Sequence, residues 1–205
     1  MDLFGNDIQQ IKKVEDNYLF FDTETTGLPR SWSAPVTDLN NWPRLVQLAW
    51  LLSDNTGKEL TSGSCIVRPE GFTIPVEVSK IHGITTERAE AEGVPLETAL
   101  AEFNKLINRS THIIAHNISY DEKIIGAEFI RKNVKNAFAE KKLICTKEKG
   151  TNFCAIPGGS GFKWPKLAEL YIKLFGTGFD GAHNAVADVT ATARCFWEMR
   201  KRGIL

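Results

Sequence analysis

Short apolar runs separated by polar turns dominate the first third of the chain. The run at 18–21 passes directly into the acidic stretch 22–27, which predicts a buried strand that leaves the core at an acidic tip. Further strands are predicted at 45–52 and at about 59–68, and the Asn-Thr-Gly turn between them favours antiparallel pairing. Residues 29–43 contain three prolines and two tryptophans and therefore predict a long loop.

Helical spacing begins in the middle of the chain and alternates with short strands from there on. Apolar residues from Leu96 to Ile107 recur three and four positions apart, which is the spacing of an amphipathic helix. This order predicts one α/β domain over residues 1–205, in which helices pack on a mixed sheet. The later elements that we expect are a strand at 112–116, a helix near 120–132, a strand near 143–145, a helix at 167–174 and a helix from about 185 to 202.

The charge balance excludes one broad class of nucleic-acid binder. Lysine and arginine total 25, aspartate and glutamate total 25, and the formal net charge is therefore zero. A histone-like protein, or one that binds through a basic tail, carries a strong positive excess. Any binding of nucleic acid must therefore depend on a local site.

Neither a membrane span nor a secretion signal is visible in the sequence. No stretch reaches the roughly 18 apolar residues that a span requires, and the N-terminus lacks a basic start followed by an apolar run. The cysteines are widely spaced without a C-x-x-C pair, so we expect reduced, partly buried thiols in a cytoplasmic protein with no membrane partner. The cysteines are Cys65, Cys145, Cys154 and Cys195.

The most informative residues are two acids at the end of the first predicted strand. Asp22 and Glu24 lie two positions apart, and side chains alternate between the faces of a strand, so both carboxylates point the same way. Two like charges held together cost free energy unless a cation or a proton offsets them. An ordinary surface turn also favours such residues, so this pair alone does not define a site.

Two later segments contribute one acid each. A Ser-x-x-Glu capping box places Asp121 in the first turn of a helix, although acids in first turns also simply complement the helix dipole. If Asn184 is the N-cap of the last helix, His183 lies in the preceding loop and can turn toward Asp188. Taken singly, this histidine is an ordinary loop residue, and only the combination favours a site.

Together these segments resemble the DEDDh (DnaQ-like) family of 3′-to-5′ exonucleases, the histidine-bearing branch that includes the proofreading epsilon subunit of bacterial DNA polymerase III. The resemblance extends from Tyr18 to Arg200. Three ordered motifs at suitable separations argue against chance similarity. The segments that carry it are Phe21–Gly27, His116-Asn117 with Tyr120-Asp121, His183 five residues before Asp188, and the intervening Ile81–Thr85 and Lys166–Leu170.

The resemblance implies a fold and a metal site. The fold would be RNase H-like, an α/β architecture with a five-stranded mixed sheet flanked by helices. Asp22, Glu24, Asp121 and Asp188 would hold two Mg²⁺ ions, with Mn²⁺ accepted, and carboxylate oxygens are independently the hard ligands that suit these ions. His183 would take a proton from the attacking water as general base, because the unperturbed pKa of histidine, about 6.5, suits that task.

The same resemblance places residues around the 3′ end of a strand. Main-chain groups at the level of Thr23 would meet the 3′-hydroxyl group, and His82 and Ile84 would pack on the terminal nucleotide. Leu28 would wedge against the terminal bases, although plain packing also explains an apolar residue there. The predicted substrate-binding residues are Thr23, Thr25, Thr26, Leu28, His82 and Ile84.

A basic stretch and three tryptophans are candidates for holding the rest of the strand. Residues 131–149 contain seven lysines or arginines and two glutamates, and seven minus two gives a local charge of +5, which either attracts phosphates or forms a solvated helix face. Trp32, Trp42 and Trp164 either stack on bases or pack in the interior, the more common fate of aromatic residues. Gly158–Gly161 do not fit a P-loop, and we expect a flexible segment there.

The leading prediction is a 3′-to-5′ exonuclease that acts on DNA, single strands foremost, and releases 5′-mononucleotides. One alternative is an exoribonuclease similar to RNase T or oligoribonuclease, since no contact to a 2′-hydroxyl group can be read from the sequence. Another is a catalytically silent polymerase-accessory module, against which the retained acids and His183 argue. The chain ends at Leu205 without the tail by which epsilon subunits bind the polymerase, so we expect a stand-alone enzyme, of open oligomeric state, over a docked subunit.

Overall fold

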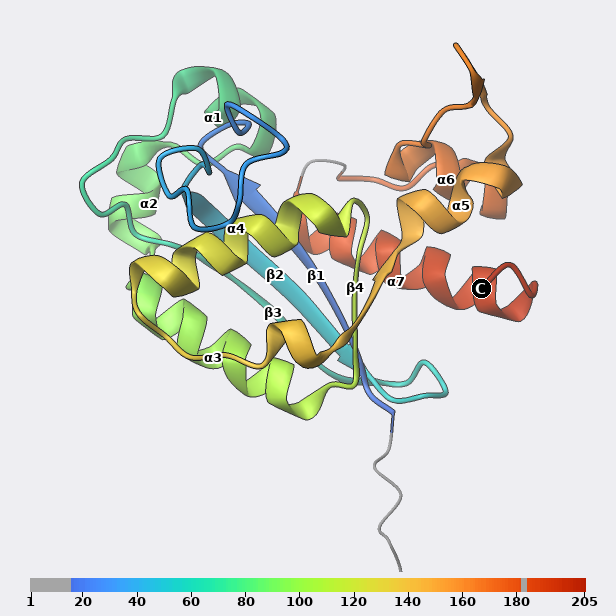
Figure 1. The fold of residues 1–205 in the computed structure, drawn as a ribbon, viewed down its shortest axis with the longest axis horizontal. Helices are drawn as coiled ribbons and strands as arrows, with labels where there is room; N and C mark the ends of the chain where they lie inside the picture. Colours follow the sequence, from blue (N-terminus) through green and yellow to red (C-terminus); the bar gives the residue numbers. More distant parts are fainter. Residues whose placement is uncertain (1–15, 182–183) are drawn as a thin grey trace, which may run out of the picture.

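A five-stranded mixed sheet forms the centre of the computed structural model, which describes residues 16–181 and 184–205. The strand order is β3-β2-β1-β4-β5, with β1 in the middle (Figure 1). The pairs β1–β2 and β2–β3 are antiparallel and the pairs β1–β4 and β4–β5 are parallel, which confirms the predicted mixed sheet. The strands are β1 (Tyr18–Thr25), β2 (Leu45–Ser53), β3 (Glu59–Ile66), β4 (His112–Ala115) and β5 (Lys142–Cys145).

Helices cover both faces of the sheet. The helices α3 and α4 lie on one face and α7 lies on the other, with α5 and α6 packed beside α7 (Figure 1). Within the described part of the chain, no helix has both the length and the apolar character needed to cross a bilayer. The helices are α1 (Val76–His82), α2 (Thr86–Glu92), α3 (Leu96–Arg109), α4 (Ile118–Arg131), the 3-10 turn η1 (Phe138–Glu140), α5 (Thr146–Cys154), α6 (Leu167–Phe175) and α7 (Ala185–Lys201).

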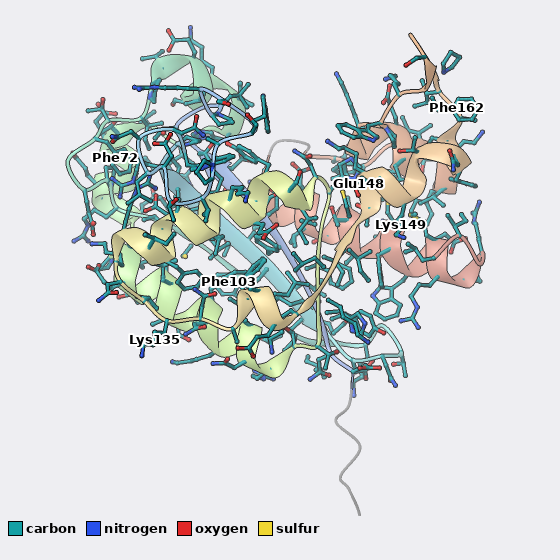
Figure 2. The ribbon with its side chains drawn as sticks, in the orientation of Figure 1. Phe72, Phe103, Lys135, Glu148, Lys149 and Phe162 are labelled. Atoms are coloured by element: carbon teal, nitrogen blue, oxygen red, sulfur yellow. The ribbon has the colours of Figure 1, made fainter. Side chains whose placement is uncertain are left out.

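Alternation along β1 sends its side chains into two separate cores. Phe21 packs on the face of α3, where its ring centroid lies 5.2 Å from that of Phe103, the central aromatic residue labelled in Figure 2. Phe20 points to the opposite face and meets Phe196 of α7 at 5.3 Å. Because both faces are covered, β1 reads as a continuous apolar run rather than as an alternating one.

One local prediction is wrong: the helix α4 begins at Ile118 after Asn117, whose backbone is left-handed and whose side chain forms no cap, so no capping box starts this helix. No sequence pattern indicated α1 and α2, because α1 leaves Val76 and Ile81 exposed and so shows no amphipathic spacing. The glycine-rich segment forms a short hairpin of β6 (Pro157–Gly158) and β7 (Gly161–Phe162), and its flexibility stays a prediction.

A buried carboxylate fastens the loop 29–43 to the body of the domain. Oε1 of Glu128 lies 2.9 Å from Nε of Arg44 and 2.9 Å from Nη1 of Arg131, and it accepts the N–H group of Leu45 at 3.0 Å. Nη2 of Arg131 in turn donates to the carbonyl oxygens of Leu39 and Trp42. Glu128 and Arg131 therefore connect α4 to the C-terminal end of this loop and to the start of β2.

Replacing Glu128 by glutamine should lower the free energy of unfolding by about 3–5 kcal/mol, because two arginines would lose the carboxylate that neutralises them in the interior. Urea denaturation measures the effect. The matched control is Glu102→Gln, which removes an exposed ion pair with Lys105 and should cost less than about 1 kcal/mol. Equal losses in the two variants would contradict this role for Glu128.

Candidate active site

Two carboxylates project from the end of the central strand toward α7. Asp22 and Glu24 occupy the same face of β1 as Tyr18 and Phe20, the residues that pack on α7. Asp188 lies in the first turn of α7 and completes the group. One oxygen atom from each of the three carboxylates can be chosen so that all lie within 4.8 Å of one another.

The fourth acid, Asp121, reaches the site from the opposite face of the sheet. It lies in the first turn of α4, which follows β4, and β4 runs parallel to β1, so α4 begins at the edge where β1 ends. Oδ1 of Asp121 accepts hydrogen bonds from the N–H group of Thr23 at 3.2 Å and from its hydroxyl group at 2.7 Å. Thr23 therefore holds Asp121 beside the strand that carries Asp22 and Glu24.

Burial and mutual repulsion raise the pKa values of these carboxyl groups. The pKa of Asp22 lies well above its usual value, first through burial and then through the charges of Asp121, Glu24 and Asp188. Burial, with the charges of Asp188 and Asp121, raises the pKa of Glu24 to about 8. Burial raises the pKa of Asp121 to about 7 against the opposing hydrogen bonds from Thr23. Clustered, oxygen-only donors with excess negative charge fit hard divalent cations.

In EDTA the protein should lose stability as the pH rises from about 4 to about 8. The pKa values of Glu24 and Asp121 rise on folding from 4.5 and 3.8, so the folded state binds more protons than the unfolded state in this window, and stability falls with pH. Urea denaturation along this pH range measures the decline. The decline should be shallower in Glu24→Gln and in wild-type protein with Mg²⁺. An unchanged slope in both cases would contradict the electrostatic account.

The expected position of His183 falls outside the described residues, but the helix start that follows it is described. The side chain of Asn184 accepts the N–H group of Val186 at 3.0 Å, which confirms Asn184 as the N-cap of α7. The main chain of Asp188 continues the helix by donating to the carbonyl oxygen of Asn184. The described helix therefore starts directly after residue 183 in the sequence, with Asp188 in its first turn.

A second histidine fixes the walls of the site. Nε2 of His116 lies 3.1 Å from the carbonyl oxygen of Pro165, an acceptor only, so Nε2 carries the proton. Nδ1 then accepts from the hydroxyl group of Thr146 at 3.0 Å. Burial lowers the pKa of His116 to about 4, so the ring is neutral at physiological pH. His116 therefore ties the end of β4 to the start of α5 and to the segment before α6.

A cavity of about 280 Å³ adjoins Glu24 on the side of α1. Four of the predicted substrate-binding residues line it, namely Thr23, Thr25, Leu28 and His82. Leu28 is 74% exposed, so its side chain is available for contact with a ligand. Contact of these four residues with a substrate stays a prediction.

The other two predicted substrate-binding residues serve the fold in this structure. Ile84 is 1% exposed and belongs to an apolar cluster with Val46 and Ile74, directly behind His82, to whose Nδ1 its N–H group donates at 3.2 Å. The hydroxyl group of Thr26 accepts the N–H group of Arg44 at 3.0 Å. The family resemblance placed both residues near the 3′ end of a strand, and their contact with a substrate stays a prediction.

Tyr120 holds the turn that carries Leu28. Its hydroxyl group lies 2.7 Å from Oγ1 of Thr25 and donates to the carbonyl oxygen of Gly27 at 2.7 Å. Trp32 from the long loop lies over Tyr120, with ring centroids 5.7 Å apart. The sequence offered Tyr120 only as part of a motif, and its position 95 residues from Thr25 explains why no local pattern revealed the contact.

A mixed sheet whose central strand ends in buried carboxylates, completed by acids from two helix starts, is the architecture of the metal-dependent exonucleases. Residues 19–196 match the exonuclease family RNase_T, and the chain belongs to this family. No protein of curated function matches the sequence.

Solved structures of similar fold include exonuclease I of E. coli in complex with a dA16 oligonucleotide. That structure has a TM-score of 0.72 and 20% sequence identity, and the match covers 92% of this chain and 41% of exonuclease I. The zinc-bound complex of E. coli exonuclease I with single-stranded DNA gives a TM-score of 0.71 at 21% identity, with 92% and 41% covered. This chain therefore spans about two fifths of the length of exonuclease I.

Proposed function

We propose that the protein is a 3′-to-5′ exonuclease that hydrolyses DNA, single strands foremost, and releases 5′-mononucleotides. The observation that carries the proposal is the convergence of Asp22, Glu24 and Asp188 within 4.8 Å, with Asp121 fixed beside them by Thr23. Membership of the exonuclease family supports the reaction class. The binding of dA16 and dT13 oligonucleotides by E. coli exonuclease I, a protein of similar fold, supports a single-stranded DNA substrate.

The four acids would hold two Mg²⁺ ions, and Mn²⁺ would be accepted. Such a pair lowers the pKa of a water molecule and neutralises the charge that develops on the attacking and departing oxygens. By resemblance to the family, Asp22 would be shared between the two ions. Glu24 and Asp188 would then hold the ion on the side of the attacking water. Asp121, oriented by Thr23, would support the ion on the side of the leaving group.

His183 would act as the general base that removes a proton from the attacking water. The N-cap at Asn184 supports this role, because the helix that carries Asp188 in its first turn starts directly after position 183 of the sequence. Its unperturbed pKa of about 6.5 leaves a large neutral fraction at physiological pH.

The 3′-terminal nucleotide would enter the cavity beside Glu24. Leu28, the exposed residue of the turn held by Tyr120, would lie against the terminal base, and His82 would form the opposite wall. Burial lowers the pKa of His82, so this wall is uncharged at neutral pH. A largely apolar recess of about 280 Å³ next to the acids would take one terminal nucleotide, which favours removal of single nucleotides from an end.

A panel of substrates tests the proposal. Single- and double-stranded DNA and RNA of one sequence are incubated with Mg²⁺ or with EDTA, and released mononucleotides are quantified. We expect release from single-stranded DNA with Mg²⁺ and none with EDTA. Faster release from RNA would replace the proposal by an exoribonuclease, and release from no strand would favour a silent accessory module. Copurification with a polymerase would favour the narrower epsilon-like role over a stand-alone enzyme.

A further inference from the structure

A second cavity, of about 540 Å³, adjoins the acids on the side of α5 and α6. It borders Asp188, whereas the first cavity borders Glu24, and among the described residues the two cavities share no lining side chain. Since Glu24 and Asp188 approach within 4.8 Å, the acidic cluster separates two recesses. A phosphodiester held at the cluster has a nucleotide on each side, so a strand cleaved there needs space on both sides.

The second cavity contains Lys147, whose positive charge also acts on the nearby acids, since it opposes the rise that burial causes in the pKa of Asp121. Within the described residues Lys147 forms no ion pair; its Nζ donates to Oδ1 of Asn117, the residue that precedes α4. Of the other cations of the basic stretch 131–149, Arg131 pairs with Glu128 and Lys132 with Glu70 and Glu97, and none lines this cavity. An ammonium group offers three donors, so Lys147 retains capacity for an anion.

An aromatic surface lies directly beside this cation. Nζ of Lys147 lies 4.3 Å from the ring centroid of Trp164, and the indole side chain remains 61% exposed. The neighbouring Pro165 is held by its hydrogen bond from His116, so the segment that presents the indole is anchored to β4. Trp42 contrasts with it, because Trp42 is buried and bonded to Pro35 and cannot stack on a base.

We propose that this cavity binds the nucleotide on the 5′ side of the scissile phosphate, with its base on Trp164 and a phosphate on Lys147. The inference rests on the proposed function and assigns the place of the departing strand. Aromatic surfaces combined with cations are the chemistry by which proteins bind single-stranded nucleic acid without reading its sequence. Contact with Lys147 leaves most of the Trp164 indole exposed on a cavity that also borders Asp188, so the indole surface remains available to a base.

Binding of a labelled single-stranded oligonucleotide in EDTA, followed by fluorescence anisotropy, tests the site without turnover. Trp164→Ala should weaken binding about 5- to 100-fold, and Trp164→Phe should restore most of it. Lys147→Met should weaken binding and reduce the slope of log affinity against log salt by about 0.7, whereas Trp164→Ala should leave this slope unchanged. Affinity and slope that stay at wild-type values in both variants would overturn the inference.

The matched controls are Lys135→Met and Phe162→Ala. Figure 2 shows Lys135 and Phe162 on opposite sides of the molecule, and neither residue lines the cavity. Phe162 is 52% exposed on the hairpin and so matches Trp164 as an exposed aromatic residue. Neither control should change the affinity by more than about twofold, and losses equal to those of Lys147→Met and Trp164→Ala would overturn the assignment to this cavity.

A small ester separates this subsite from the catalytic centre. The p-nitrophenyl ester of thymidine 5′-monophosphate has a single ring in place of the departing strand. Trp164→Ala should raise KM for oligonucleotides of DNA or RNA while hydrolysing the ester at near wild-type rates. Equal losses of Trp164→Ala on ester and oligonucleotide would overturn the inference. Wild-type protein that cleaves neither strands nor ester would contradict the proposed function itself.

Discussion

Asp22→Asn is expected to lower the rate of nucleotide release by at least about 10³-fold, because each 1.36 kcal/mol of lost transition-state stabilisation costs a factor of ten and metal sites supply several kcal/mol. Asp22 is the acid whose pKa is raised by all three of the others, which places it at the electrostatic centre of the cluster. Release of mononucleotides from single-stranded DNA with Mg²⁺ measures the effect. Asp38→Asn, a change of an exposed acid in the long loop, is the matched control and should retain wild-type activity.

Although Asp22→Asn should lower activity, it should raise the stability of the metal-free protein. In EDTA, Asp22→Asn removes one of the buried like charges and should raise the free energy of unfolding at about pH 8. Mg²⁺ should stabilise the wild type more than the variant, because a ligand stabilises only the folded state that binds it. An inactive variant that was also less stable in EDTA would contradict the account, since misfolding would then explain the loss of activity.

The second large effect is expected for His183→Ala, which should lower turnover about 10²- to 10⁴-fold, the usual contribution of a general base. Stabilisation by Mg²⁺ should stay close to that of the wild type, because the four acids remain. The rise of activity with pH around about 6.5 should also disappear, since it reports the deprotonation of this histidine. Initial rates across this pH range measure both effects.

A matched control for this histidine lies at the other end of the sheet. His112 stacks on Tyr18 with ring centroids 4.5 Å apart and pairs with it at the start of β1, whereas Asp22 lies near the end of that strand. His112→Phe keeps a ring for stacking and should retain wild-type turnover. Near-normal cleavage by His183→Ala at neutral pH would remove His183 as the base.

The sequence predicted those strands, side-chain directions and helix starts that are determined by residues close together along the chain. The apolar runs of β1 and β2 are buried on both faces and stand out from polar turns. The common direction of Asp22 and Glu24 follows from strand alternation alone. The N-cap at Asn184 follows from the preference of short polar side chains for the start of a helix.

What the sequence did not predict depends on contacts between distant segments. The hydroxyl and N–H groups of Thr23 hold Asp121, a residue 98 positions away. The two contacts of His116 in the site wall share this property, since Thr146 follows 30 positions later and Pro165 49 positions later. Ile84 lies next to a site motif in the sequence and inside an apolar cluster in space, because the short helices α1 and α2 turn its side chain inward.

The direction of degradation is the most direct test of metal-dependent 3′-to-5′ exonuclease activity. A single-stranded DNA oligonucleotide labelled at its 5′ end is incubated with the wild-type protein and Mg²⁺, and the labelled products are resolved by length over time. The account predicts a ladder that shortens by one nucleotide per step from the 3′ end, with the label retained on the long products, and no ladder in EDTA or with Asp22→Asn. Early release of the label as a mononucleotide, internal fragments without a ladder, or cleavage that persists in EDTA would contradict it.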